Sequence, residues 1–142
     1  MTVVRKSRIV PYSCEQMYNL VNDIEKYGDF LPYFNKSEVH HRNDDEVQAT
    51  LHVAAAGMTK SFTTHNRLQP NKMIFIRLVD GPFSHLEGFW RFDETSEGCM
   101  ISFDLEFDFA GKMFSLLLGP VFEQVTNKMV DSFCARADEL YG

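Results

Sequence analysis

The last thirty residues of the chain constrain its fold more than any other stretch. Their apolar side chains recur every three or four residues, which places them on one side of an α-helix with polar side chains on the other. Polar residues interrupt the pattern too often for a membrane-spanning helix. A long one-sided helix needs a large apolar surface to pack against. The apolar set is Leu117, Leu118, Val121, Phe122, Val125, Met129, Phe133, Ala137 and Leu140.

Pro120 interrupts this helix, because a proline removes one backbone hydrogen bond and clashes with the preceding turn. We expect a kink or break near Gly119–Pro120, with an apolar segment, Met113 to Leu118, hinged to a main helix that starts at about Pro120. Two interpretations remain: an ordinary helix start, which proline suits, and a movable flap over a cavity.

Residues 36–109 alternate between apolar and polar side chains, which predicts β-strands with one face in water. The clearest strand is 101–109, where aromatic and aliphatic residues alternate with serine and acids. The alternation is weaker over 58–68, because Thr64 and Asn66 share the parity of Phe62 and Leu68. Turn residues separate these short runs, which implies antiparallel hairpins.

The N-terminal third predicts a strand over 2–10 and then a short helix. Ser13 and Gln16 have the spacing of a capping box at the start of that helix. The aromatic stretch 27–34 is too apolar for a plain exposed loop, so it should pack on the core or rim an opening into it. The order is strand, two short helices, about six strands and a long helix. We expect one α+β domain over 1–142, a curved antiparallel sheet of about seven strands wrapped around the C-terminal helix.

Composition excludes several classes of function. The formal net charge of −6 opposes attraction to nucleic acid or anionic lipid, and Arg5, Lys6 and Arg8 are expected on a solvated face. Three cysteines without a Cys-x-x-Cys pair give neither a disulfide framework nor a zinc pattern. With no signal segment, a cytoplasmic protein is the expectation. Thirteen phenylalanines suggest an aromatic core or a pocket lined by rings.

Several short segments, taken in order, resemble one known family. They are 21–27 (VNDIEKY), 30–32 (FLP), 119–122 (GPVF), 129–133 (MVDSF) and 136–142 (RADELYG). The chain is similar over essentially its whole length to the coenzyme Q-binding proteins and the bacterial ribosome association toxins, which have the helix-grip, START-like fold. It departs from them at Gly28, where the family usually has proline, and at Tyr33-Phe34, where tryptophan and cysteine are common.

The resemblance implies a hydrophobic cavity between sheet and helix that binds ubiquinone or another polyprenyl lipid in support of respiration. No cofactor is expected to be required beyond such a bound lipid. The resemblance also raises binding to the large ribosomal subunit, which would block subunit joining, and polyketide cyclisation. The expected partners are a quinone or lipid, the large ribosomal subunit and, transiently, the inner-membrane surface; DNA is not expected.

No catalytic or metal-binding constellation stands out in the sequence. His40 and His41 are adjacent, so in a strand they point to opposite faces, and His52 and His65 are expected on a polar face. The candidate cavity residues are therefore mostly apolar, as in ligand pockets generally. Arg77 is the exception: it either points outward or meets a lipid head group inside the cavity. The full set is Phe30, Leu31, Pro32, Phe62, Arg77, Trp90, Phe92, Phe103, Phe107, Val121, Phe122, Val125 and Met129.

Overall fold

A computed structural model describes residues 1–55 and 57–142. Its helices and strands follow one another in nearly the order that the hydrophobic pattern predicts. In order they are β1 (Thr2–Val10), α1 (Cys14–Asn22), the 3₁₀ helix η1 (Ile24–Asp29), β2 (Phe34–Arg42), β3 (Glu46–Ala55), β4 (Met58–Gln69), β5 (Met73–Asp80), β6 (Phe83–Thr95), β7 (Gly98–Phe109), α2 (Lys112–Asn127) and α3 (Met129–Tyr141).

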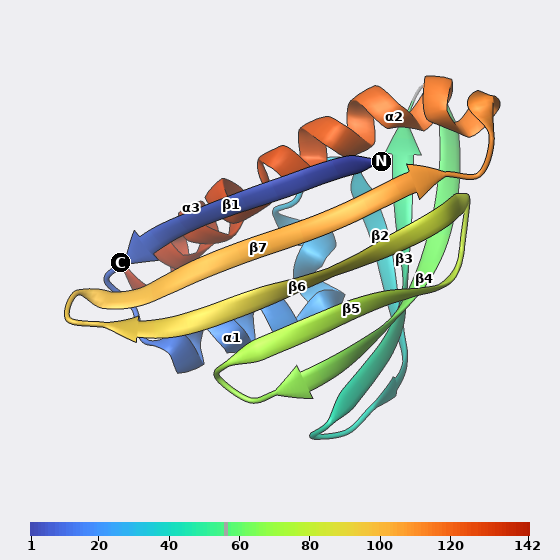
Figure 1. Ribbon diagram of the computed structural model, residues 1–142. Helices are drawn as coiled ribbons and strands as arrows, with labels where there is room; N and C mark the ends of the chain where they lie inside the picture. Colours follow the sequence, from blue (N-terminus) through green and yellow to red (C-terminus); the bar gives the residue numbers. More distant parts are fainter. Residues whose placement is uncertain (56) are drawn as a thin grey trace.

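The seven strands form one antiparallel sheet in the order β1-β7-β6-β5-β4-β3-β2. Consecutive strands from β2 to β7 pair as hairpins, and β1 pairs with β7, so β1 and β2 are the two edges of the sheet. The strand directions turn strongly across the sheet: β2–β4 run steeply in Figure 1, whereas β1, β7 and β6 run along its length. Register shifts, such as that between Thr63 and Thr64, lie within the long strands and add to the bend. The predicted curved sheet is confirmed.

The C-terminal helices α2 and α3 lie along the inner face of this sheet (Figure 1). Their buried side chains belong to the predicted apolar stripe and join one hydrophobic core with the strands. The stripe is buried less evenly than predicted, since Leu117 and Leu140 are exposed.

Of the kink or break predicted near Gly119–Pro120, the break is wrong, and so is the helix start at Pro120. Helix α2 continues through Pro120, and the break lies at Lys128, between α2 and α3. The Thr126 hydroxyl donates to the Phe122 carbonyl oxygen (2.9 Å), and the Asn127 amide donates to the Glu123 carbonyl oxygen (2.9 Å). Side chains that donate to carbonyl oxygens four residues earlier compete with the backbone hydrogen bonds of the helix and bend it. The hydrogen bond missing at Pro120 falls on an exposed side of the helix, where water can replace it.

The two short helices cover the rest of the inner face. Ser13 caps α1 as predicted, because its hydroxyl accepts from the Gln16 backbone and the Gln16 side chain accepts from the Ser13 backbone. Tyr27 of η1 donates its hydroxyl to the Val21 carbonyl oxygen and so ties η1 to α1. Among the described residues, no helix is long and apolar enough to cross a membrane.

Candidate functional site

A cavity of about 70 Å³ lies between the inner face of the sheet and the helices. Strands β2–β7 form one wall, and η1, α2 and α3 form the other. Fourteen of its seventeen lining residues are apolar or aromatic. They are Ile24, Tyr27, Phe34, Ala49, Leu51, Phe62, Thr64, Asn66, Ile76, Leu86, Trp90, Phe103, Leu105, Phe122, Thr126, Met129 and Phe133.

Five of the thirteen predicted cavity residues line this space: Phe62, Trp90, Phe103, Phe122 and Met129. They come from five different elements, so the fold has brought them together.

Seven other predicted residues lie elsewhere and correct the prediction. Those that are buried pack in the hydrophobic core outside the cavity. These seven are Phe92, Phe107, Val125 and Leu31, which are buried, Phe30 and Val121, which are half-buried, and Pro32, which is exposed.

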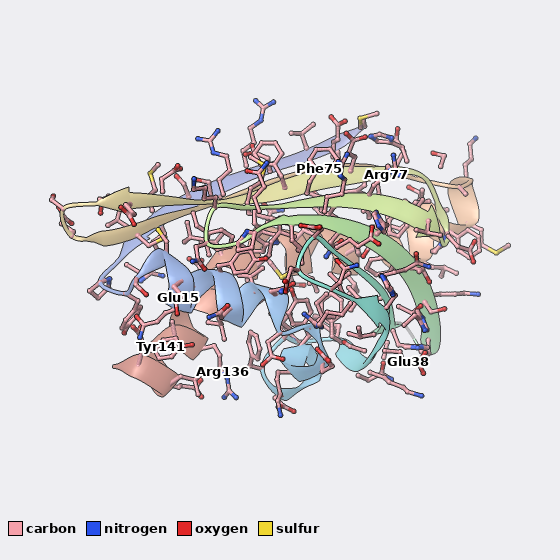
Figure 2. The ribbon with its side chains drawn as sticks, turned by 90° about the horizontal axis from the view of Figure 1, so that it is seen from below. Glu15, Glu38, Phe75, Arg77, Arg136 and Tyr141 are labelled. Carbon is pink, nitrogen blue, oxygen red and sulfur yellow. The ribbon has the colours of Figure 1, made fainter. Side chains whose placement is uncertain are left out.

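Of the two alternatives for Arg77, the outward direction is confirmed, and its place among the candidate cavity residues is wrong. Its side chain is exposed, and Figure 2 shows Arg77 with Phe75 on the face of the sheet that points away from α1 and α3. Arg77 alternates with Ile76, which lines the cavity, so strand geometry directs the arginine to the opposite face.

Twelve lining residues were missed by the sequence-based prediction. Two signals could have found some of them: the parity of Thr64 and Asn66 with Phe62, and the aromatic stretch that contains Tyr27 and Phe34. No sequence signal distinguishes Leu86 or Leu105, which line the cavity, from the other inward-facing residues of β6 and β7. Every second residue of these strands is buried in the same way.

Aromatic rings form much of the wall. The rings of Trp90 and Phe103 stack with centroids 4.3 Å apart, and Phe133 meets Trp90 edge-on at 5.2 Å. Tyr27 meets Phe133 edge-on at 5.4 Å. Such stacked and edge-to-face ring contacts stabilise the wall.

Three lining side chains are polar: Thr64 and Asn66 on β4 and Thr126 on α2. Asn66 is 7% exposed, and its Oδ1 has no hydrogen-bond partner among the described atoms. The Tyr27 hydroxyl is bonded to the Val21 carbonyl oxygen, and burial raises the pKa of Tyr27, so this phenol stays neutral. No carboxylate, imidazole, amine or thiol is found among the described lining residues.

The titratable side chains gather on the outer face instead. His65 lies 2.9 Å from Glu46, and His85 lies 3.0 Å from Glu106. The hydrogen bond from His65 lowers the pKa of Glu46. Among the described residues there is no group of three or more potential metal ligands. The outer face has the charged, solvated character that the sequence predicts for it.

One part of the enclosing helices is weakly held. In the first two turns of α2 only Leu118 is buried, whereas Met113 is 70% exposed and Leu116 is 77% exposed. Lys60 on β4 lies over the Phe114 ring, 5.3 Å from its centroid. Few buried contacts therefore fix this end of α2, the condition under which local opening costs least.

Comparison with known proteins places this architecture in a family. Residues 10–134 match the model of the family described as polyketide cyclase/dehydrase and lipid transport. The chain is 41% identical over 142 residues to the ribosome association toxin RatA of Pseudomonas aeruginosa, with 99% of each chain covered. It is 30% identical to coenzyme Q-binding protein COQ10 homolog B of Xenopus laevis, covering 96% of this chain and 58% of that protein.

A solved structure from Thermus thermophilus has the same fold, with a TM-score of 0.82 at 19% identity over 99% of this chain and all of that one. The fold and the sequence agree on one assignment. The chain belongs to the polyketide cyclase/dehydrase and lipid transport family, in the branch of the ribosome association toxins and coenzyme Q-binding proteins.

Proposed function

We propose that the protein binds a polyprenyl quinone, with ubiquinone as the first candidate, in the cavity between sheet and helices and carries it without changing it chemically. The observation that supports this proposal most strongly is the character of the cavity wall, which is apolar and aromatic with three neutral polar side chains. Ligand sites for apolar molecules have this composition. The relative named as a coenzyme Q-binding protein supports the choice of ligand.

Carriage is favoured over catalysis because the described lining residues offer no group suited to general acid or base work at neutral pH. A cyclase needs such a group within hydrogen-bond reach of its substrate. Tyr27 is the single phenol among the described lining residues, and its hydroxyl already donates to the Val21 carbonyl oxygen.

The cavity has to enlarge before a quinone can enter. Its volume of about 70 Å³ is well below the roughly 300–1,000 Å³ of ordinary ligand pockets. The first two turns of α2 are the part of the enclosure with the fewest buried side chains. We infer that these turns move outward on binding, so that the isoprenoid chain extends beside exposed Met113 and Leu116.

The single tryptophan makes this proposal directly testable, since Trp90 lines the cavity. Quinones quench indole fluorescence on contact, so titration with decylubiquinone should quench Trp90 emission in a saturable manner. Ala49→Leu fills the cavity from β3 and should abolish saturable quenching. Ala54→Leu, a matched change on the outer face of the same strand, should leave it intact. Equal quenching in all three proteins would contradict the cavity assignment.

A second function, association with the large ribosomal subunit, is favoured by a different observation: the full-length similarity to proteins named ribosome association toxins. The net charge of −6 opposes direct contact with ribosomal RNA, so we infer contact through a ribosomal protein. Sucrose-gradient profiles after overexpression test this. A rise in free subunits at the expense of joined ribosomes supports it, and unchanged profiles remove it.

A further inference from the structure

Asn66 lies in the middle of an apolar wall. It projects from β4 on the same face as Phe62, Thr64 and Leu68, all of which are buried. Its side chain is more than nine-tenths buried and lines the cavity, and its Oδ1 has no hydrogen-bond partner among the described atoms.

An amide whose oxygen has no partner is unusual at a buried position in an apolar wall. Buried polar side chains almost always have partners in folded proteins, because losing hydration without replacing the hydrogen bond destabilises the fold. The neighbours of Asn66 on adjacent strands are Val47 and Ile76, which offer no side-chain partner. An aliphatic side chain would pack better against this surface, so packing alone does not explain an asparagine at position 66.

Two further polar groups face the same cavity. Thr64 lies two residues earlier on the same face of β4, about 7 Å away along the strand. Thr126 lies opposite, on α2, with its hydroxyl within reach of the Phe122 (2.9 Å) and Glu123 (3.1 Å) carbonyl oxygens. The Thr126 hydrogen is used by the helix, so its oxygen is left as an acceptor.

From this geometry we propose that Asn66 is the head-group anchor of the cavity and that it binds a ring oxygen of a quinone or hydroquinone. The inference rests on the proposed function and specifies which part of the ligand lies where. A carboxamide has one acceptor oxygen and two N–H donors, so it can donate to a quinone carbonyl or accept from a hydroquinone hydroxyl. Asn66 therefore suits a carrier that takes both oxidation states.

The same wall selects against charged lipids. A phosphate or carboxylate head group beside Asn66 would be buried without a counter-charge, because the described lining residues include no lysine, arginine or histidine. Flat, neutral and oxygen-bearing rings fit both the amide and the aromatic surfaces of Trp90 and Phe103.

The test compares two ligands that differ in their ring oxygens, decylubiquinone and decylbenzene, on the full chain by calorimetric titration. The parent protein should prefer decylubiquinone. Asn66→Leu should weaken decylubiquinone binding roughly 5- to 100-fold, the range for one lost buried hydrogen bond, and leave decylbenzene binding unchanged or tighter. Asn35→Leu, which removes an exposed amide on β2, should change neither.

A spectroscopic readout keeps the test independent of the variant's folding. The side-chain ¹⁵N–H₂ resonance of Asn66 in the parent protein should shift with decylubiquinone and not with decylbenzene. An unshifted resonance, or equal weakening of both ligands in Asn66→Leu, overturns the anchor role while quinone binding itself stands. A parent protein that binds neither ligand overturns the proposed function and the anchor together.

Discussion

Tyr27 shows how much one buried side chain contributes to the wall of the cavity. Its ring contacts Phe133 and Phe30, and its hydroxyl closes a hydrogen bond from η1 to the last turn of α1. The residue therefore holds the short helices against α3 while its phenol stays out of any chemistry.

We predict that Tyr27→Phe lowers the free energy of unfolding by about 1–2 kcal/mol, because the buried Val21 carbonyl oxygen loses its donor. Urea unfolding at pH 7 measures the change. Tyr33→Phe, at an exposed tyrosine, is the matched control and should be neutral within about 0.5 kcal/mol. A neutral Tyr27→Phe would show that the hydroxyl does not stabilise the η1–α1 junction.

The same residue gives a prediction about alkaline pH. Burial raises the pKa of Tyr27 in the folded state, whereas the unfolded phenol titrates near pH 10. Below pH 10 the Tyr27 hydroxyl keeps its proton in both the folded and the unfolded state, so its full contribution to the free energy of unfolding is present. Above pH 10 only the unfolded state releases it, so stability should fall by up to about 1.4 kcal/mol per pH unit. Tyr27→Phe should remove that part of the alkaline slope.

The cysteines are predicted to be unreactive in the folded protein. Cys14 and Cys99 are buried with their sulfur atoms 2.9 Å apart, and burial is the main cause that raises the pKa of Cys99. Burial likewise raises the pKa of Cys134. Because the thiolate is the reactive form, iodoacetamide at pH 8 should label these positions far more slowly than in urea. Rapid labelling of Cys99 in the native protein would contradict the packing of α1 on β7.

At the scale of elements, α2 has two unlike halves. Its second half packs Phe122, Val125 and Thr126 into the core, whereas its first half buries only Leu118. Gly119 lies between them, and of the atoms around it only Phe109 Cε2, at 3.9 Å, would contact an added Cβ. Because Gly119 has a helical backbone and open space around it, alanine can take its place without strain.

We predict that Gly119→Ala raises the free energy of unfolding by about 0.5–1 kcal/mol, since alanine restricts the unfolded chain and favours the helix. Gly98→Ala is the control for which we expect a change in stability of the opposite sign. Gly98 has a φ of +144°, and a Cβ there would lie 2.2 Å from the Val10 carbonyl oxygen, so this change should destabilise. Thermal and urea unfolding measure both. A destabilised Gly119→Ala would indicate that α2 needs a bend at this position.

At the scale of the whole molecule, the cavity closes only because sheet and helices are brought together from every part of the chain. A ligand that occupies it should therefore stabilise the whole fold. At a free concentration one hundred times its Kd, binding adds about 2.7 kcal/mol to the free energy of unfolding.

For a domain of this size, decylubiquinone at that concentration should raise Tm by roughly 5–10 °C. Differential scanning fluorimetry with and without ligand measures the shift. The cavity-filled Ala49→Leu variant should have a Tm equal to or above that of the parent without ligand and show no ligand shift. A shift that persists in Ala49→Leu would place the binding site elsewhere on the surface.

Much of the fold could be predicted from local patterns. Ser13 and Gln16 predicted the start of α1, because a capping box depends on residues three apart. Alternation from Ile101 to Phe109 predicted β7 and its buried face, because the side chains of a strand alternate regardless of their neighbours. The order of these elements also came from the pattern, and the family resemblance matched that order to the helix-grip fold.

Tertiary structure alone decided the site. Phe92, Phe107 and Val125 have the same apolar character as Trp90, Phe103 and Phe122, yet only the latter three line the cavity, because its position depends on where a curved sheet and a bent helix pair separate. The outward direction of Arg77 depended on the register of β5, and the break at Lys128 depended on side-chain bonds that compete with the helix backbone. Periodicity in the sequence determines which side of an element is buried; three-dimensional packing determines where that burial leaves a space.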